Sequence, residues 1–167
     1  MINKYKKIVI KIGSSSIIKS KTKKINSTWI IELCKEIQKY HNEKKIIIVC
    51  SGAIALGSTL IKKNKILRKL EDKQAAASVG QIELAHQWRS HLKKYKINIA
   101  QVLITLDDSE VRRRYLNARK TINTLLNNKI IPVVNENDTV ATEEIRYGDN
   151  DRLAARVAQM IDADLLI

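Results

Sequence analysis

Residues 130–151 read IIPVVNENDTVATEEIRYGDND. The first five residues are apolar and mostly β-branched, which predicts a buried strand. Acidic and amide side chains follow at 135–138, and a second such group, 148–151, precedes an amphipathic helix expected over 152–161. In an α/β chain, carboxylates and amides at the carboxyl end of a strand lie where such sheets bind ligands. This stretch therefore predicts a ligand site at one edge of a sheet.

Strand and helix patterns alternate through the rest of the chain. Runs rich in β-branched residues predict strands over 6–12, 45–50, 97–106 and 130–134, and a further strand from about 164. Helical spacing predicts helices over 29–40, 71–95, 112–126 and 152–161. This alternation predicts an α/β fold, a mainly parallel sheet sandwiched by helices in three αβα layers.

Two further turns carry ligand-binding chemistry. Gly13 and Ser14 follow the first strand, where glycine lets backbone approach a ligand and Lys11 can hold a phosphate as a point charge. Small residues follow the second strand, and amides at the start of a helix form an anion site. Taken alone, the first turn is better explained as an ordinary turn, and the second is equally well explained as one. With the polar stretch after the fourth strand, however, they share one sheet edge.

The chain is strongly basic, with 31 Lys and Arg against 17 Asp and Glu and a net charge of +14. A nucleic-acid-binding domain is one explanation. The lysines are scattered over helix faces and loops without interleaved aromatic residues, so we favour compositional drift and expect no nucleic-acid binding. Residues 112–119 contain the densest arginine cluster. This cluster suits phosphate or nucleic acid, but equally an ion pair with the acidic loop beyond Asn135, and we slightly favour the pairing.

Cysteine and hydropathy patterns bear on the compartment. Cys34 and Cys50 have no metal-binding spacing, which indicates two buried thiols in a reducing cytosol. No apolar run reaches the ~18 residues of a membrane span, and the N-terminus lacks a signal-peptide pattern. We therefore expect a cytoplasmic protein without membrane contact.

These motifs together resemble the glutamate 5-kinases of the amino-acid kinase superfamily. The similar stretches are 9–15, 51–57, 74–81, 116–121 and 131–151. The combination of Asn-Glu-Asn-Asp with Gly-Asp-Asn-Asp is the most specific of these features. The resemblance implies transfer of the γ-phosphoryl group of ATP to the γ-carboxylate of L-glutamate, the first step of proline biosynthesis, with ATP and Mg²⁺ as cofactors.

The resemblance also implies roles for individual residues. Lys11 would stabilise the transferring phosphoryl group, and Asp149 and Asp151 would orient Lys11 or its neighbours. Lys11 and Asp151 are thus the expected catalytic residues. The residues expected at L-glutamate are Ser51, Gly52, Ala53, Asn135, Asp138, Asp149 and Asn150, and those expected at ATP are Lys11, Gly13 and Ser14.

Members of the resembled family continue well past the position that matches residue 167. We therefore expect residues 1–167 to be the N-terminal substrate-binding part of an amino-acid kinase domain, without the nucleotide-binding C-terminal part and not a competent kinase alone. Some members add an RNA-modification-type domain. The resemblance further implies a homo-oligomer inhibited by proline, with 139–147 as a candidate sensor.

Three alternatives stay open at the level of sequence. One is another superfamily member, such as an acetylglutamate or uridylate kinase, against which the two acidic motifs argue. The second is the basic nucleic-acid-binding domain described above. The third is a non-catalytic remnant of a kinase, which the intact site residues oppose.

Overall fold

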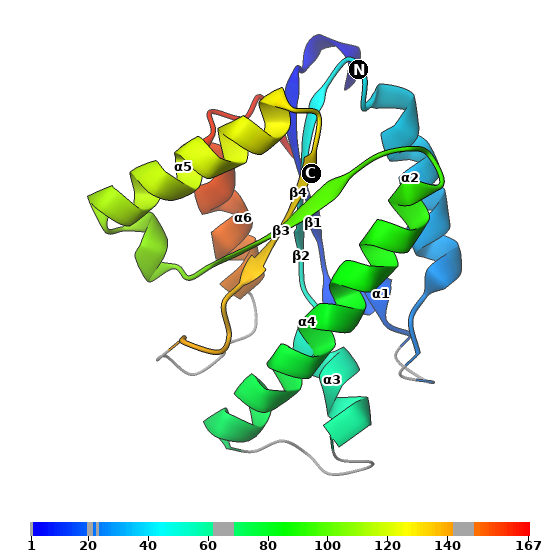
Figure 1. Cartoon of the computed structure of the whole chain (residues 1–167), viewed down its shortest axis with the longest axis vertical. Coiled ribbons are helices and arrows are strands. Elements are labelled where there is room, and N and C mark those ends of the chain that lie inside the picture. The colour runs from blue at the N-terminus through cyan, green and yellow to red at the C-terminus, as the bar shows by residue number, and fades with distance from the viewer. Residues whose placement is uncertain (1, 20–21, 23, 62–68, 142–148) are drawn as a thin grey trace.

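The computed structural model of the chain describes residues 2–19, 22, 24–61, 69–141 and 149–167 (Figure 1). Its centre is a five-stranded parallel sheet with the strand order β3-β4-β2-β1-β5. The strands are β1 (Lys7–Ile12), β2 (Lys45–Cys50), β3 (Ile99–Ile104), β4 (Ile131–Glu136) and β5 (Leu165–Leu166). The predicted parallel α/β sheet is confirmed.

Helices connect the strands in the expected alternation. They are α1 (Ser14–Ile17), α2 (Ser27–Tyr40), α3 (Ala53–Ile61), α4 (Leu70–Lys93), α5 (Arg112–Asn127) and α6 (Asp149–Met160), with short 3₁₀ turns η1 (Ile2–Lys4) and η2 (Asp107–Ser109).

The central strand β2 shows how the three layers form. Ile46, Ile48 and Cys50 belong to a core that α2, α3 and α4 complete on one face of the sheet. Ile47 and Val49 belong to a second core that α5 and α6 complete on the other face. A strand buried on both faces is apolar at nearly every position, which is why 46–50 reads as one continuous run. The predicted αβα sandwich is therefore confirmed.

The order of the strands places a topological switch point between β2 and β4. The chain moves from β1 to β2 to β3 over the face of α2, α3 and α4, and then returns to β4 and β5 over the face of α5 and α6. Crossovers of one hand must change face when the direction of travel reverses. The neighbouring strands β2 and β4 therefore send their following segments to opposite faces. Such a switch point is where open α/β sheets bind ligands.

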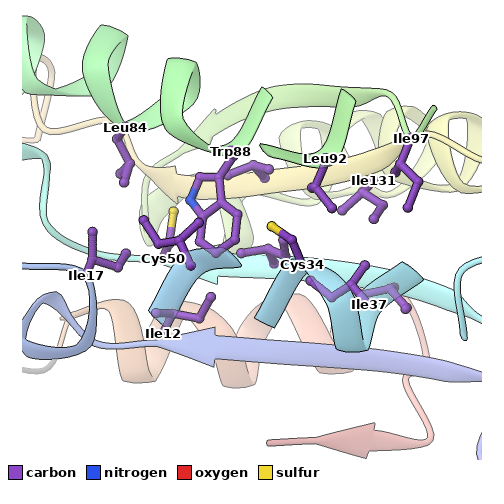
Figure 2. Packing of buried hydrophobic residues seen from close by; sticks show 14 of the residues in the cluster. Ile12, Ile17, Cys34, Ile37, Cys50, Leu84, Trp88, Leu92, Ile97 and Ile131 are labelled. Carbon is purple, nitrogen blue, oxygen red and sulfur yellow. The ribbon is translucent and has the colours of Figure 1, made fainter. Parts of the chain in front are cut away.

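The largest core residue is Trp88 of α4. Figure 2 shows its ring between the α4 side chains Leu84 and Leu92 and the thiols Cys34 and Cys50. Both cysteines are free and buried, as expected, and burial raises the pKa of each thiol to about 12. The apolar stripe of α4 is thus part of the core.

Helices α3 and α4 pack backbone to backbone through two glycines. A Cβ atom on Gly57 would lie 1.8 Å from the Ala76 carbonyl oxygen, and a Cβ on Gly80 would lie 1.8 Å from that of Ala53. The small residues of 74–81 therefore allow the close approach predicted from the sequence.

One predicted boundary is wrong. Helix α6 begins at Asp149 rather than 152, so Asn150 and Asp151 lie in its first turn and are not residues that precede and cap it. The field of the helix also favours carboxylates in the first turn. The position of acidic residues near the start of a helix therefore does not by itself determine the first residue of that helix.

Candidate functional site

The predicted site residues come together at the carboxyl edge of the sheet because its strands are parallel and in close register. Ile12 lies opposite Cys50, and Val49 lies opposite Val134. The residues that follow these positions are consequently level with one another. Lys11 lies near the end of β1, with Gly13 and Ser14 after that strand. Ser51, Gly52 and Ala53 follow β2, Asn135 lies near the end of β4, and Asp138 follows β4.

Lys11 is positioned by the alternation of β1. It shares a sheet face with Val9, which packs in the core of α6, and its ammonium group forms an ion pair with Asp151 in the first turn of α6. The two side chains are 28% and 59% exposed. Ion pairs this exposed contribute little to stability. The pair of Asp151 with Lys11 is therefore not a major contributor to the stability of the fold.

Glycine at position 13 keeps the space around Lys11 open. A Cβ atom there would lie 3.7 Å from Lys11 Nζ, in contact with the ammonium group. The one-turn helix α1 starts at the next residue, Ser14. The ammonium group of Lys11 thus lies beside the start of α1.

The turn after β2 has a backbone conformation that favours glycine. Gly52 has φ +117°, a conformation that L side chains rarely adopt, and its carbonyl accepts the first helical hydrogen bond of α3 from Leu56 at 3.0 Å. The first amides of a helix have no partner within it and suit an anion. Ser51 and Ala53 therefore flank a small anion-binding turn.

Buried oxygens gather beside this turn. Asn135 is 3% exposed, and its Oδ1 atom is buried without a hydrogen-bond partner among the described residues; the same holds for Oδ1 of Asn150. Asp138 and Glu136 are each 8% exposed and interact with other groups. A buried acceptor without a partner costs about 1–3 kcal/mol. Two such acceptors at one sheet edge are able to accept hydrogen bonds from a donor group, such as an ammonium group.

Some predictions fall outside what the structure describes. These are the Asp149 side chain, Gly148 and the part of the candidate sensor at 142–147. The backbone of Asp149 begins α6.

The arginine cluster has a different described partner from the favoured one. Arg114 pairs with Asp108, which precedes α5, at 3.3 Å, and Arg112 and Arg113 are exposed. This contact holds the start of α5 and joins no residue of the loop after β4.

Sequence reasoning missed a set of polar residues on α4. Gln74, Ser78 and Gln81 contact the segment that follows β4. The small residues of 74–81 account for the packing of α4 but give no hint of these contacts. The spacing of the three polar residues, which places them on one helical face, is the signal that could have identified them.

Comparison with known proteins places the chain in a family. A family model described as "Amino acid kinase family" matches residues 6–167. The chain belongs to the amino acid kinase family. A likeness to the UMP kinase of Bacillus anthracis, with a TM-score of 0.62 and 15% identity, covers 97% of this chain and 63% of that one. At this identity the likeness shows the shared fold.

Relatives in this family are identical to the chain at about half of the positions in the region that they match. A glutamate 5-kinase of Rhodopseudomonas palustris (strain HaA2) is 52% identical and one of Nitrobacter hamburgensis 53% identical, each over 99% of this chain. One of Bartonella henselae is 54% identical over 98% of it. The chain spans only 43–44% of the length of these relatives.

None of the described helices is long and apolar enough to cross a bilayer.

Proposed function

We propose that the chain supplies the glutamate-binding part of a glutamate 5-kinase, which transfers the γ-phosphoryl group of ATP to the γ-carboxylate of L-glutamate. One observation carries this proposal. Buried oxygens of Asn135 and Asn150, which lack partners among the described residues, lie at the same sheet edge as the ion-paired Lys11. A ligand with an ammonium group at one end and a reacting anion at the other fits that arrangement.

The α-amino end of glutamate is assigned to the buried oxygens. The amide oxygens of Asn135 and Asn150 and the carboxylate of Asp138 are acceptors, and bonds from an ammonium group to such acceptors are charge-assisted and strong. The hydroxyl of Ser51 and the amides at Gly52 and Ala53 are donors for carboxylate oxygens.

The transfer step then needs no general base, because the nucleophile is already an ionised carboxylate. An oxygen of the γ-carboxylate forms a bond to the γ-phosphorus as the bond from that phosphorus to the ADP oxygen breaks. The products are glutamyl 5-phosphate and ADP. Rate acceleration in such a step rests on positioning and charge neutralisation.

Lys11 supplies that neutralisation in the proposal, and Asp151 keeps its ammonium group aimed at the phosphoryl group. The backbone amides around Gly13 and Ser14 face the phosphates of ATP. Asp149, at the start of α6, is assigned to orienting Lys11 from the same turn.

A kinase reaction also uses Mg²⁺. Across the parts of the chain that the structure describes, no group of three His, Cys, Asp or Glu side chains could hold a metal ion. We therefore assign no Mg²⁺ ligand to these residues and take no step through the metal.

The relatives are longer than this chain, and their extra length bears on where ATP binds. Because the relatives are more than twice as long as the matched region, we propose that their remaining length supplies most of the ATP-binding surface. The 167-residue chain would then bind L-glutamate without catalysing its phosphorylation. Glutamate-dependent ADP release by the purified 167-residue chain would contradict this division.

The proposal extends to regulation and assembly. Proline carries the same ammonium and carboxylate pair as glutamate, so we expect it to compete for this site in a homo-oligomeric enzyme. Proline should raise the apparent KM for glutamate without changing kcat, and sedimentation should give more than one copy. An increase in kcat or no effect of proline would contradict the first expectation.

The substitution Lys11→Ala in the complete gene product tests the catalytic assignment. Loss of a charge-stabilising contact lowers turnover by about 10²- to 10³-fold. Circular dichroism and melting temperature should stay unchanged, since Lys11 makes an exposed ion pair. Lys45→Ala is a matched control, because Lys45 begins β2 at the opposite sheet edge and bonds Asn127 at 2.8 Å. Near-normal turnover of the Lys11 variant would refute the assignment.

A substrate panel separates the proposal from its rivals. The complete gene product should phosphorylate L-glutamate, but neither N-acetylglutamate nor UMP. Salt-sensitive RNA binding in place of glutamate turnover would favour the basic nucleic-acid-binding alternative.

A further inference from the structure

Helix α4 contacts both substrate-binding segments at the switch point. Its Gly80 lets the α4 backbone approach the carbonyl of Ala53, directly after the Ser51–Gly52 turn. Around the same part of the helix, at residues 74–81, polar side chains reach the segment 136–141, which contains Asp138. One helix thus contacts both the segment that follows β2 and the segment that follows β4.

The contacts to segment 136–141 come from one helical face. Gln74, Ser78 and Gln81 are spaced by four and three residues, so their side chains line up along the helix. Gln74 Nε2 donates to the carbonyl of Ala141 at 3.1 Å, and Ser78 Oγ lies 3.2 Å from Thr139 Oγ1. The segment 136–141 therefore runs antiparallel to this part of α4, since residues later in the helix bond residues earlier in the segment.

Gln81 closes the other end of this contact. Its Nε2 donates to the carbonyl of Glu136 at 3.4 Å, and its Oε1 accepts a hydrogen bond from Gln101 of β3 at 3.2 Å. Gln81 is only 9% exposed. Gln101 thus fixes the orientation of the Gln81 amide, which leaves its donor side towards Glu136.

The segment has its own internal turn. The amides of Val140 and Ala141 both donate to the carbonyl of Asn137 at 3.1 Å, and the amide of Asn137 donates to Ile104 of β3 at the same distance. A turn of this kind fixes local shape, but its placement relative to α3 depends on contacts with another element. Gln74 and Gln81 provide these contacts at the two ends, with Asp138 between them.

We propose that Gln74 and Gln81 are positioning residues for L-glutamate, which set the place of Asp138 relative to the Ser51–Ala53 turn by tying both to α4. This inference rests on the proposed function. The two glutamines touch no reacting atom in it, so their loss should weaken the binding of glutamate and leave ATP and the transfer step almost unchanged.

The test is steady-state kinetics of the complete gene product carrying Gln74→Met, which keeps the length of the side chain and removes its donor. The loss of one such hydrogen bond should raise KM for glutamate roughly 3- to 10-fold, with kcat and KM for ATP within about twofold. Gln74→Glu, which also lacks the donor, should behave alike.

A matched control lies on the same helix. Gln87 bonds Glu83 at 2.6 Å, one turn earlier on α4, and makes no contact with segment 136–141 among its described hydrogen bonds. Gln87→Met should leave both KM values unchanged. Gln81→Met should reproduce the glutamate-specific effect if it folds, and the partly exposed Gln74 keeps the test decisive if it does not.

The outcomes separate the two proposals. If the wild-type complete gene product does not phosphorylate L-glutamate, the proposed function itself is refuted. Normal wild-type turnover with an unchanged glutamate KM in Gln74→Met overturns the positioning role alone. A parallel loss of kcat, both KM values and melting temperature also overturns it, since that pattern marks a purely structural residue.

Discussion

Adding one methyl group at Gly80 tests how α3 and α4 pack. In Gly80→Ala the new Cβ would lie 1.8 Å from the Ala53 carbonyl oxygen, whereas real Cβ contacts essentially never fall below 3.0 Å. Both groups belong to backbone, so no side-chain rotation relieves the clash. The helices must separate by the difference, about 1.2 Å.

Two opposing effects set the magnitude. Overpacking costs typically ~1–3 kcal/mol, and a backbone clash of this depth belongs at or above the upper end. Alanine within a helix gains about 1 kcal/mol over glycine. The net loss is therefore about 2 kcal/mol or more, which lowers the melting temperature of a chain this size by roughly 4–8 °C.

The assay is thermal and urea unfolding of the 167-residue chain. Ala75→Gly, at an exposed position of α4, calibrates helix propensity alone and should cost about 1 kcal/mol. The double variant Gly57→Ala/Gly80→Ala should lose less than the sum of the single variants, because one separation of the helices relieves both clashes. A Gly80→Ala variant that melts at or above the wild-type temperature would refute the reasoning.

Three further predictions concern titratable groups. Two backbone N–H groups before and at the start of β1 lower the pKa of Asp164, so its charged form stabilises the fold. Asp164→Asn should lower stability at neutral pH, and the difference from wild type should vanish as pH falls through the lowered pKa. Burial and, to a smaller extent, the positive charge of Lys129 lower the pKa of His41. The folded state should therefore lose stability as pH falls below about 6.5, where the unfolded chain takes up a proton more readily. His41→Gln should flatten that decline, as measured by urea titrations at several pH values. Cys34 and Cys50 each have a pKa of about 12, so only about one thiol in 10⁴ is ionised at pH 8. Both should resist iodoacetamide at this pH in the folded protein and react fully in urea. Rapid labelling of the folded protein, detected by mass spectrometry, would contradict their burial.

The layers of the fold could be predicted from the sequence, because a strand buried on both faces appears as a continuous apolar run. The apolar run of β2 and the helical stripe of Leu84, Trp88 and Leu92 each imply one structural role, and the structure bears out both. The meeting of Lys11 with the acidic segments also followed from strand order, since parallel strands end at one edge.

Other features depended on tertiary contacts that local sequence does not encode. Acidic residues are favoured both before and within the first helical turn, so the start of α6 could not be fixed from 149–151. Arg119 of the arginine cluster pairs with Asp162 at 2.5 Å, and only the fold brings these two residues together, since they lie 43 positions apart in the chain. The role of Gln74 and Gln81 was hidden because a polar residue on a helix gives no sign of which loop it will meet.

Strand β4 lies between β2 and β3, although the ribosome makes it after both. Until Glu136 has emerged, β2 and β3 lack the strand that joins them, and each presents an unpaired edge. Such edges make incomplete chains prone to aggregate. Polypeptides released before Ile131 should therefore be insoluble and bind chaperones. Those that extend past Glu136 contain β4 and can pair β2 and β3 with it.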